Sequence, residues 1–153
     1  MIELKKILFP TDFSEPSEEA KLYAISFAKG FGATLYVLTV SQPLNINLSS
    51  ADPVILYDLD ARLESGAREN LEHLKEELTR EGVQVQTALR RGTPYLEIVK
   101  FAEENNIDLI IMGTHGWSGF DHIILGSTTE KVVRKAPCPV LTVRPVLRPF
   151  VRV

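Results

Sequence analysis

Cysteine is nearly absent from this sequence: Cys138 is the single one among 153 residues. One cysteine excludes an internal disulfide framework and fits a reducing compartment. Long hydrophobic runs are also missing, since no apolar stretch approaches the roughly 18 residues of a membrane-spanning helix. The opening MIELKKILFP is too short and too charged for the apolar region of a signal peptide. We therefore expect a cytoplasmic protein with no membrane contact.

The sequence lacks an excess of positive charge. Its 17 lysines and arginines are outnumbered by 20 aspartates and glutamates, which leaves a net charge of −3. Proteins that neutralise nucleic-acid phosphates carry a clear basic surplus, so nucleic acid is not expected as a partner. The three histidines show no metal-ligand spacing, and one cysteine adds too little for a zinc site, so no metal site is predicted.

Several familiar catalytic and phosphate-binding motifs are missing. The chain has no G-x4-G-K-[ST] loop, and no G-x-G-x-x-G follows its first apolar run. LGSTT, residues 125–129, lacks the second glycine of a nucleophile elbow. We therefore predict neither a P-loop nor a dinucleotide fingerprint, and we assign no residue as catalytic.

What is present is the composition of a globular protein, with 44% hydrophobic and 24% charged residues. A chain of this length most simply forms one domain, and it buries enough surface to need no disulfide or metal. We expect residues 1–153 to form that single domain.

Apolar runs alternate with amphipathic stretches along the chain. The apolar runs predict five strands, at 6–9, 33–40, 83–89, 107–112 and 139–143. Stripes at helical spacing predict four helices between them, at 14–30, at 61–81, from 93 onward, and at 127–136. This alternation implies a parallel sheet with helices on both faces, a three-layer α/β/α open sandwich. Right-handed crossovers and the apolar character of the first and fourth strands favour the order 3-2-1-4-5.

Residues with capping preferences mark the expected helix starts. Ser14 is placed to cap the first helix, and Thr93 with Pro94 starts the third. Ser127 and Glu130 have the spacing of a capping box at the start of the last helix. The second helix is expected to carry one apolar face, which consists of Leu63, Ala67, Leu71, Leu74 and Leu78.

The predicted strand order brings two loops together. Ligands of open α/β sheets bind outside the carboxyl ends of the strands, where the connections leave to opposite faces. The loops at this point are PTDFSE, residues 10–15, and the glycine-containing stretch 113–126. Gly113 and Gly116 permit close approach of the backbone to a ligand, and the helix start that follows favours an anion. These features are consistent with a nucleotide.

Each of these residues also has a purely structural interpretation. Glycines in a long loop are more often turn formers than phosphate cradles. Ser127 and Thr128 carry hydroxyls that can donate to a phosphate, but Ser127 suits a simple helix cap as well. Asp12 can accept hydrogen bonds from a ribose or an adenine amine, or it can cap the first helix. The residues alone leave these alternatives open.

The pattern Gly113-x2-Gly116-x9-Gly126-Ser127 resembles the nucleotide-binding signature of the universal stress protein family. The similarity covers almost the whole chain, from ILFPTDFS near the start to GTHGWSGFDHIILGSTTEKVVRKAPCPVLTV near the end. It is a similarity to the members that bind ATP rather than to those without the glycine signature. The resemblance implies the adenine nucleotide alpha-hydrolase-like fold and a role in the stress response.

The resemblance also implies roles for individual residues. Those assigned to the adenosine lie at the ends of the first, second and fourth strands: Pro10, Thr11, Asp12, Val40 through its backbone, Met112 and Gly113. Those assigned to the ribose and phosphates follow the fourth strand: His115, Gly116, Gly126, Ser127 and Thr128. The implied cofactor is ATP, or AMP or ADP, with or without Mg²⁺.

One position departs from the family pattern. The residue after Gly116, commonly basic in the ATP-binding relatives, is Trp117 here, which weakens the expected affinity for a triphosphate. Lys131 or a Mg²⁺ ion are the alternatives that restore the missing charge. Arg90 and Arg91 end the third strand on the pocket side, where they either reach phosphates or form a solvated pair.

Two further segments are expected to move or to associate. Residues 41–60 form a long connection with little pattern at the pocket end of the sheet, and we expect a mobile loop that can act as a lid. The last strand precedes an apolar tail, residues 144–153. An unpaired apolar edge invites pairing with another chain, so we expect a homodimer through Val140–Val143, as the resemblance also implies; the alternative is a tail folded on its own domain.

Two classes of function remain. The first is a nucleotide-binding regulatory protein of the stress response. The second is an enzyme, a slow ATP hydrolase or a nucleotide-dependent transferase. His115 is the single candidate for a catalytic group near the phosphates, and no third group positions it. The first class is therefore preferred.

Overall fold

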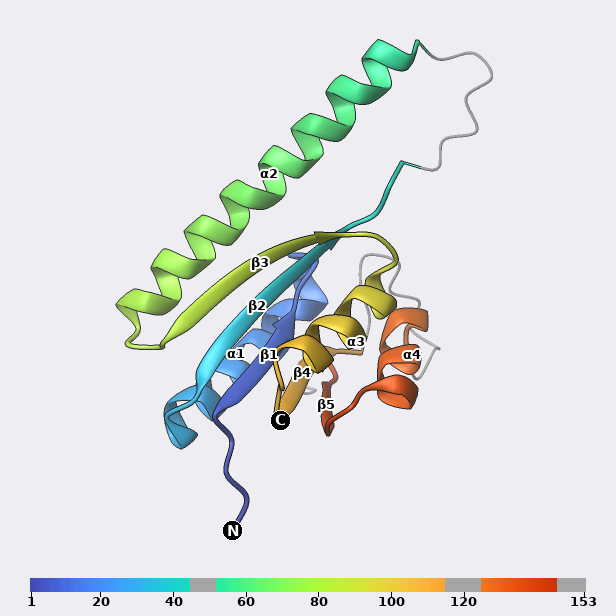
Figure 1. The fold of residues 1–153 in the computed structure, drawn as a ribbon. Helices are drawn as coiled ribbons and strands as arrows, with labels where there is room; N and C mark the ends of the chain where they lie inside the picture. Colours follow the sequence, from blue (N-terminus) through green and yellow to red (C-terminus); the bar gives the residue numbers. More distant parts are fainter. Residues whose placement is uncertain (45–51, 115–124, 146–153) are drawn as a thin grey trace, which may run out of the picture.

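The computed structural model describes residues 1–44, 52–114 and 125–145. Five parallel strands form one sheet in the order β3-β2-β1-β4-β5 (Figure 1), which confirms the predicted order. The strand bounds are β1 Lys6–Pro10, β2 Thr34–Ser41, β3 Val85–Arg91, β4 Leu109–Gly113 and β5 Val140–Val143. The two outermost strands are thus β3 and β5, and β1 and β4 are neighbours within the sheet.

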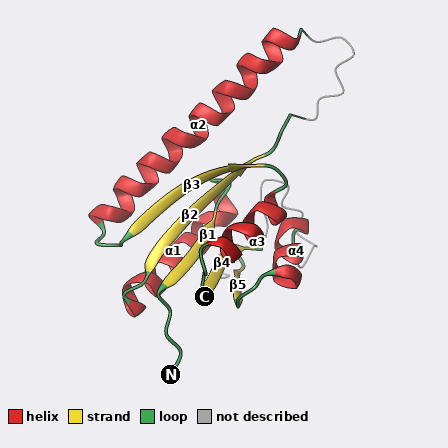
Figure 2. Ribbon diagram, viewed as in Figure 1, coloured by secondary structure: helices red, strands yellow, loops and turns green. Residues whose placement is uncertain are grey.

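Four helices cover the two faces of the sheet, as predicted (Figure 2). Their bounds are α1 Glu15–Phe31, α2 Pro53–Arg80, α3 Pro94–Glu104 and α4 Ser127–Lys135. The first two pack on one face and the last two on the other, so the molecule has the three layers that the alternating sequence pattern predicts. No helix among the described residues is long and apolar enough to cross a membrane.

Strand β1 contributes side chains to both faces of the sheet. Ile7 and Phe9 pack toward α1 and α2, whereas Leu8 packs toward α3 and α4. All three side chains are almost completely buried. Successive side chains of a strand point to opposite faces, so a strand covered on both sides must be apolar at every position. This requirement explains why KILF carries so clear a signal in the sequence.

Helix α2 begins earlier than the sequence pattern predicts. Residues 53–60 were expected in the mobile loop 41–60, but they form the first turns of this helix. The Asp52 carboxylate accepts a hydrogen bond of 2.9 Å from the Val54 N–H, and Pro53 occupies the first helical position. This capping signal starts the helix although its first turns extend beyond the sheet. Residues 45–51 of the expected loop lie outside the described residues.

The N-terminal half of α2 extends away from the sheet (Figure 1). The buried part of the predicted apolar face therefore begins at Leu71, and 53% of Leu63 is exposed. Leu71, Leu74 and Leu78 are buried against the sheet. Helical periodicity shows which residues share a face, but it does not show how far the partner surface reaches.

Candidate functional site

A cavity of about 520 Å³ opens at the carboxyl edge of the sheet. It lies where β1 and β4 are adjacent and their connections leave toward opposite faces, the position expected for a ligand in an open α/β sheet. Its lining contains every predicted site residue that the structure describes: Pro10, Thr11, Asp12, Val40, Met112, Gly113, Gly126, Ser127 and Thr128. His115 and Gly116, the other two predicted residues, lie outside the described part of the chain, as does Trp117.

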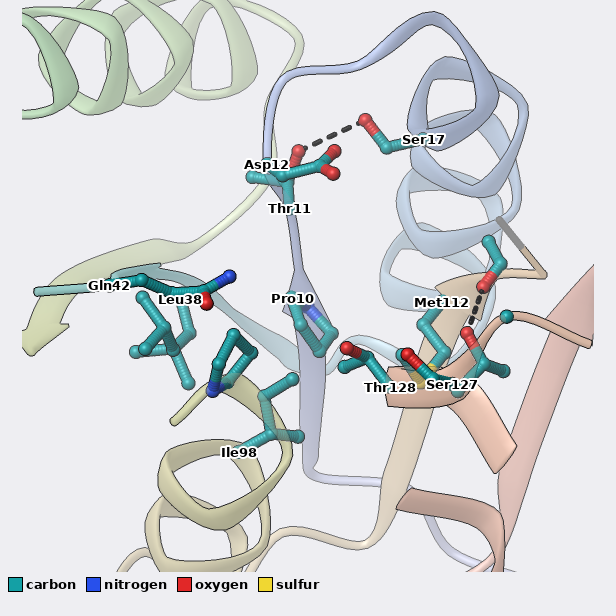
Figure 3. Close-up of a pocket in the computed structure, with 15 residues that line it drawn as sticks. Pro10, Thr11, Asp12, Ser17, Leu38, Gln42, Ile98, Met112, Ser127 and Thr128 are labelled. Atoms are coloured by element: carbon teal, nitrogen blue, oxygen red, sulfur yellow. Dashed lines mark hydrogen bonds between the residues drawn. The ribbon is translucent and has the colours of Figure 1, made fainter. Parts of the chain in front are cut away.

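The β1–α1 loop is held by a compact set of hydrogen bonds around Thr11. The Thr11 hydroxyl accepts from the Phe13 N–H at 3.0 Å and is hydrogen-bonded to the Ser17 hydroxyl at 3.1 Å (Figure 3). Its carbonyl oxygen accepts from the Thr39 hydroxyl at 3.0 Å. Phe13 adopts a left-handed backbone with φ of 59°, which bulky residues rarely do. The loop is thereby fixed at the end of β1.

The start of α1 depends on Asp12 rather than on Ser14. Ser14 occupies the capping position, but its side chain makes no capping hydrogen bond, so the predicted hydroxyl cap is wrong. The Ser14 N–H instead donates to the Asp12 carboxylate at 3.0 Å. Asp12 therefore supports the helix start and lines the cavity at the same time. The two alternatives for this residue are compatible, because a carboxylate has more than one acceptor site.

The opposite side of the cavity is the start of α4. Gly126 is the capping residue, and the Glu130 N–H donates to its carbonyl oxygen at 2.9 Å. Ser127 is the first helical residue, so the expected capping box of Ser127 and Glu130 is wrong. The reason is tertiary: the Gly126 N–H donates to the Thr114 carbonyl at 2.6 Å, which holds Gly126 in an extended conformation at the end of β4.

The first turn of α4 presents donors to the cavity. The first N–H groups of an α-helix have no acceptor within the helix, and they form the positive end of its dipole. Ser127 and Thr128 lie in this turn and line the cavity with their hydroxyls. The Thr129 hydroxyl donates to the Gly113 carbonyl at 2.9 Å. The turn is thus suited to an anion such as a phosphate.

A third wall of the cavity was missed by the sequence analysis. It comes from the end of β2 and the start of α3, which contribute Leu38, Gln42, Pro94 and Ile98. The two sides already described also include residues that were not predicted, Ser17 of α1 and Thr129 of α4. Leu38 had a detectable signal, because it lies two residues before Val40 and therefore faces the same side of the strand. The contribution of α3 had none, since only the packing of that helix on the sheet brings Pro94 and Ile98 to the cavity.

The lining is divided between apolar and polar groups. Figure 3 shows Leu38, Ile98 and Gln42 on one side of the opening, with Ser127 and Thr128 across from them. Leu38 and Ile98 are buried, so they form a firm apolar wall, and Gln42 places an amide at its rim. Such a pocket suits a ligand with a flat, largely apolar ring at one end and an anionic group at the other.

The cations expected near the pocket are engaged elsewhere. Arg90 pairs with Glu104 at 2.7 Å and lies over the Phe101 ring, and Arg91 pairs with Asp60. The Lys131 ammonium lies 4.9 Å from the centre of the Tyr95 ring. Among the described residues that line the cavity there is no lysine or arginine.

The fold and the site define an α/β protein of the doubly wound type, with a ligand cavity at the switch point of its sheet. A sequence model described as the universal stress protein family matches residues 3–144. The chain therefore belongs to the universal stress protein family, which confirms the resemblance noted in its sequence.

Relatives and solved structures agree with this assignment. Universal stress protein MJ0531 of Methanocaldococcus jannaschii is 39% identical over 143 residues, which cover 92% of this chain and 82% of that protein. MJ0577 of the same organism is 35% identical, and its structure matches with a TM-score of 0.76 over 94% of this chain and 98% of that one. The structure of UspA from Lactobacillus plantarum matches with a TM-score of 0.84 at 27% identity, over 94% of this chain and 100% of that one.

Two of the matching structures contain a nucleotide. One is a universal stress protein in complex with cAMP, 22% identical with a TM-score of 0.67, matched over 94% of this chain and 98% of that one. The other is a universal stress protein of Archaeoglobus fulgidus in complex with dAMP. It is 23% identical with a TM-score of 0.60, matched over 93% of this chain and 98% of that one. At these identities the likeness to this chain shows the shared fold alone.

Proposed function

We propose that this protein binds an adenine nucleotide in the cavity at the carboxyl edge of the sheet and acts as a regulatory protein of the stress response. One observation carries the proposal. The cavity joins an apolar wall, made by Leu38 and Ile98, to the donor-rich start of α4 at Ser127 and Thr128. An adenine ring and a phosphate have the matching chemistry at the two ends of one molecule.

The proposed arrangement assigns a part of the ligand to each wall. The adenine packs beside Leu38 and Ile98, with the Val40 backbone and the Gln42 amide at its edge. The ribose hydroxyls donate to the Asp12 carboxylate. The phosphate accepts hydrogen bonds from the first turn of α4, beginning at Gly126. The complexes of two other family members with cAMP and dAMP support an adenine nucleotide as the ligand class.

We propose binding rather than catalysis as the function. The hydroxyls of Ser17 and Thr129, both at the cavity, are hydrogen-bonded to backbone carbonyl oxygens, so neither is presented as a nucleophile beside a base. Of the described lining residues, Asp12 is the one with an ionisable side chain, and it supports the start of α1. A slow ATP hydrolase is the alternative. Loss of measurable phosphate release on changing His115→Ala would favour that alternative.

A direct test uses the purified full chain. We expect denaturation to release an adenine nucleotide that chromatography and mass spectrometry identify, or added adenine nucleotide to raise the melting temperature. The double change Ser127→Ala and Thr128→Ala should weaken binding about thirtyfold, because two hydrogen bonds are lost and each contributes on the order of 1 kcal/mol. Ser65→Ala, on the exposed part of α2, is the matched control and should bind normally. Failure of every adenine compound to bind would refute the proposal.

We propose a homodimer formed through β5 as the working state. This strand is at the sheet edge, and Val140, Leu141 and Thr142 remain partly exposed there. Among the described residues β5 pairs with β4 alone, so its outer edge can gain hydrogen bonds when a second copy pairs with it. Sedimentation equilibrium at micromolar concentration should give twice the mass of one chain, and a mass of one chain would contradict the dimer.

A further inference from the structure

The charges around the cavity bear on how many phosphates the ligand carries. The Asp12 carboxylate lines the cavity, and the lysines and arginines of the described residues are absent from its lining. The stretch that follows β4, residues 115–124, is HGWSGFDHII and has an aspartate but no lysine or arginine. The described lining therefore offers a phosphate backbone and hydroxyl donors but no cation.

Three of the cations that could turn toward the site contact other groups. Lys131 lies one turn beyond Ser127 on α4, but its ammonium is over the Tyr95 ring, which Lys135 also approaches at 5.4 Å. Arg90 is 31% exposed, paired with Glu104 and placed over Phe101. Moving any of these side chains to a phosphate would break an existing contact.

The start of α4 matches one phosphate better than three. A helix dipole is equivalent to about half an elementary charge at its N-terminus, and its effect falls off within the first turn. The Ser127 and Thr128 hydroxyls add neutral donors within the same turn. Each further phosphate brings more negative charge, extends beyond this turn and finds no cation among the described lining residues.

We infer that the site takes adenosine bearing a single phosphate in preference to ATP, and that a triphosphate needs Mg²⁺ to bind well. The inference rests on the proposed function, because it concerns the same cavity. Space is not the discriminating factor, since a cavity of about 520 Å³ is within the usual range for small-molecule sites. The preference is electrostatic, so it decreases as ionic strength rises.

The test is a calorimetric titration of the full chain with adenosine, AMP, ADP and ATP, each in EDTA and in excess Mg²⁺. It is run at pH 8, where an unperturbed histidine is neutral. In EDTA we expect AMP to bind about tenfold more tightly than ATP. The extra negative charges of ATP are repelled by the Asp12 carboxylate, and a site open to solvent has a high effective dielectric constant, which keeps this effect modest. Mg²⁺ should reduce this ratio, and so should 0.5 M salt. ATP binding more tightly than AMP in EDTA would overturn the inference and leave the proposed function intact. Absence of binding by all four compounds would overturn both.

Two substitutions test the electrostatic cause. Thr128→Lys adds a cation to the first turn of α4, and it should improve ATP binding relative to AMP by about tenfold. Thr128→Gln is the neutral control of similar length and should leave that ratio unchanged. The same ratio of ATP to AMP affinity in the Thr128→Lys and Thr128→Gln variants would contradict the inference.

Lys131→Gln tests the remaining alternative. In that alternative the Lys131 ammonium leaves the Tyr95 ring and binds the phosphates of the ligand. We expect the ratio of ATP to AMP affinity to stay within about twofold, because the Tyr95 contact keeps the ammonium away from the cavity. A selective loss of ATP binding would show that Lys131 serves the phosphates and would overturn the inference.

Discussion

The hydroxyl of Thr129 donates a hydrogen bond to the carbonyl oxygen of Gly113 at 2.9 Å, and this bond joins the first turn of α4 to the last residue of β4. Thr129 is buried, with 3% of its surface exposed. The two elements that it connects form one side of the proposed nucleotide site. This hydrogen bond therefore ties the start of α4 to the end of β4 beside the cavity.

Replacing Thr129 by valine (Thr129→Val) should lower the free energy of unfolding by about 1 kcal/mol, because the partly buried Gly113 carbonyl loses this donor while the side-chain volume is kept. Nucleotide binding should weaken together with stability, since the start of α4 loses its tie to β4. Thr129→Ser keeps the hydroxyl and should retain most of both. Chemical denaturation and calorimetry measure the two effects. Equal stability of the Thr129→Val variant and the wild-type chain would contradict this role.

Phe13 should reveal the energetic cost of its left-handed backbone. Both Phe13→Gly and Phe13→Ala lose the contacts of the ring with the core cluster, so their difference isolates the backbone. We expect the glycine variant to be more stable by about 1 kcal/mol, because the left-handed conformation costs other residues roughly 1–2 kcal/mol. Urea denaturation compares the two, and an alanine variant of equal or greater stability would argue against strain.

The two halves of α2 should respond differently to the same substitution. Leu74→Ala should lower the free energy of unfolding by about 2–5 kcal/mol, since this side chain is buried against the sheet. Leu63→Ala should change it by no more than about 0.5 kcal/mol, since 53% of that residue is exposed. Thermal and chemical unfolding of the pair provide the comparison. Similar losses at both positions would mean that the N-terminal half of α2 is covered in solution.

Cys138 should react slowly with thiol reagents at neutral pH. Burial raises the pKa of its thiol, and the negative charge of Asp108 raises it further. A raised pKa leaves less thiolate, so alkylation of the native protein should accelerate only above the ordinary cysteine range, whereas the unfolded chain should react earlier. The folded state favours the protonated thiol, so this contribution to stability is present below the unfolded pKa and is lost as the pH rises through the folded pKa.

Mass spectrometry of iodoacetamide-treated samples across the alkaline range measures the difference between native and unfolded chains at Cys138. The urea-unfolded chain is the control, because its thiol is fully solvated. Faster alkylation of the native chain than of the unfolded chain at mildly alkaline pH would contradict the raised pKa.

Much of the architecture was predictable because the sheet is parallel and covered on both faces. Ile7, Leu8 and Phe9 are all apolar for that reason, and such runs are visible without any structure. The strand order followed from handedness and from the apolar character of the first and fourth strands. The loop PTDFSE and the start of α4 were placed together by the same reasoning, and the structure brings their described residues around one cavity.

The features that the sequence did not predict depend on how elements that are remote in the chain pack against one another. Whether Ser127 or Gly126 caps α4 was decided by the Thr114 carbonyl, which holds Gly126 extended. Whether Leu63 is buried was decided by how far the sheet reaches under α2. Residue patterns describe which faces of each element are apolar, and they identified the family and the two loops of the site. The third wall of the cavity, with Ile98 and Gln42, exists only once α3 and the end of β2 have packed, because no local pattern encodes the space between them.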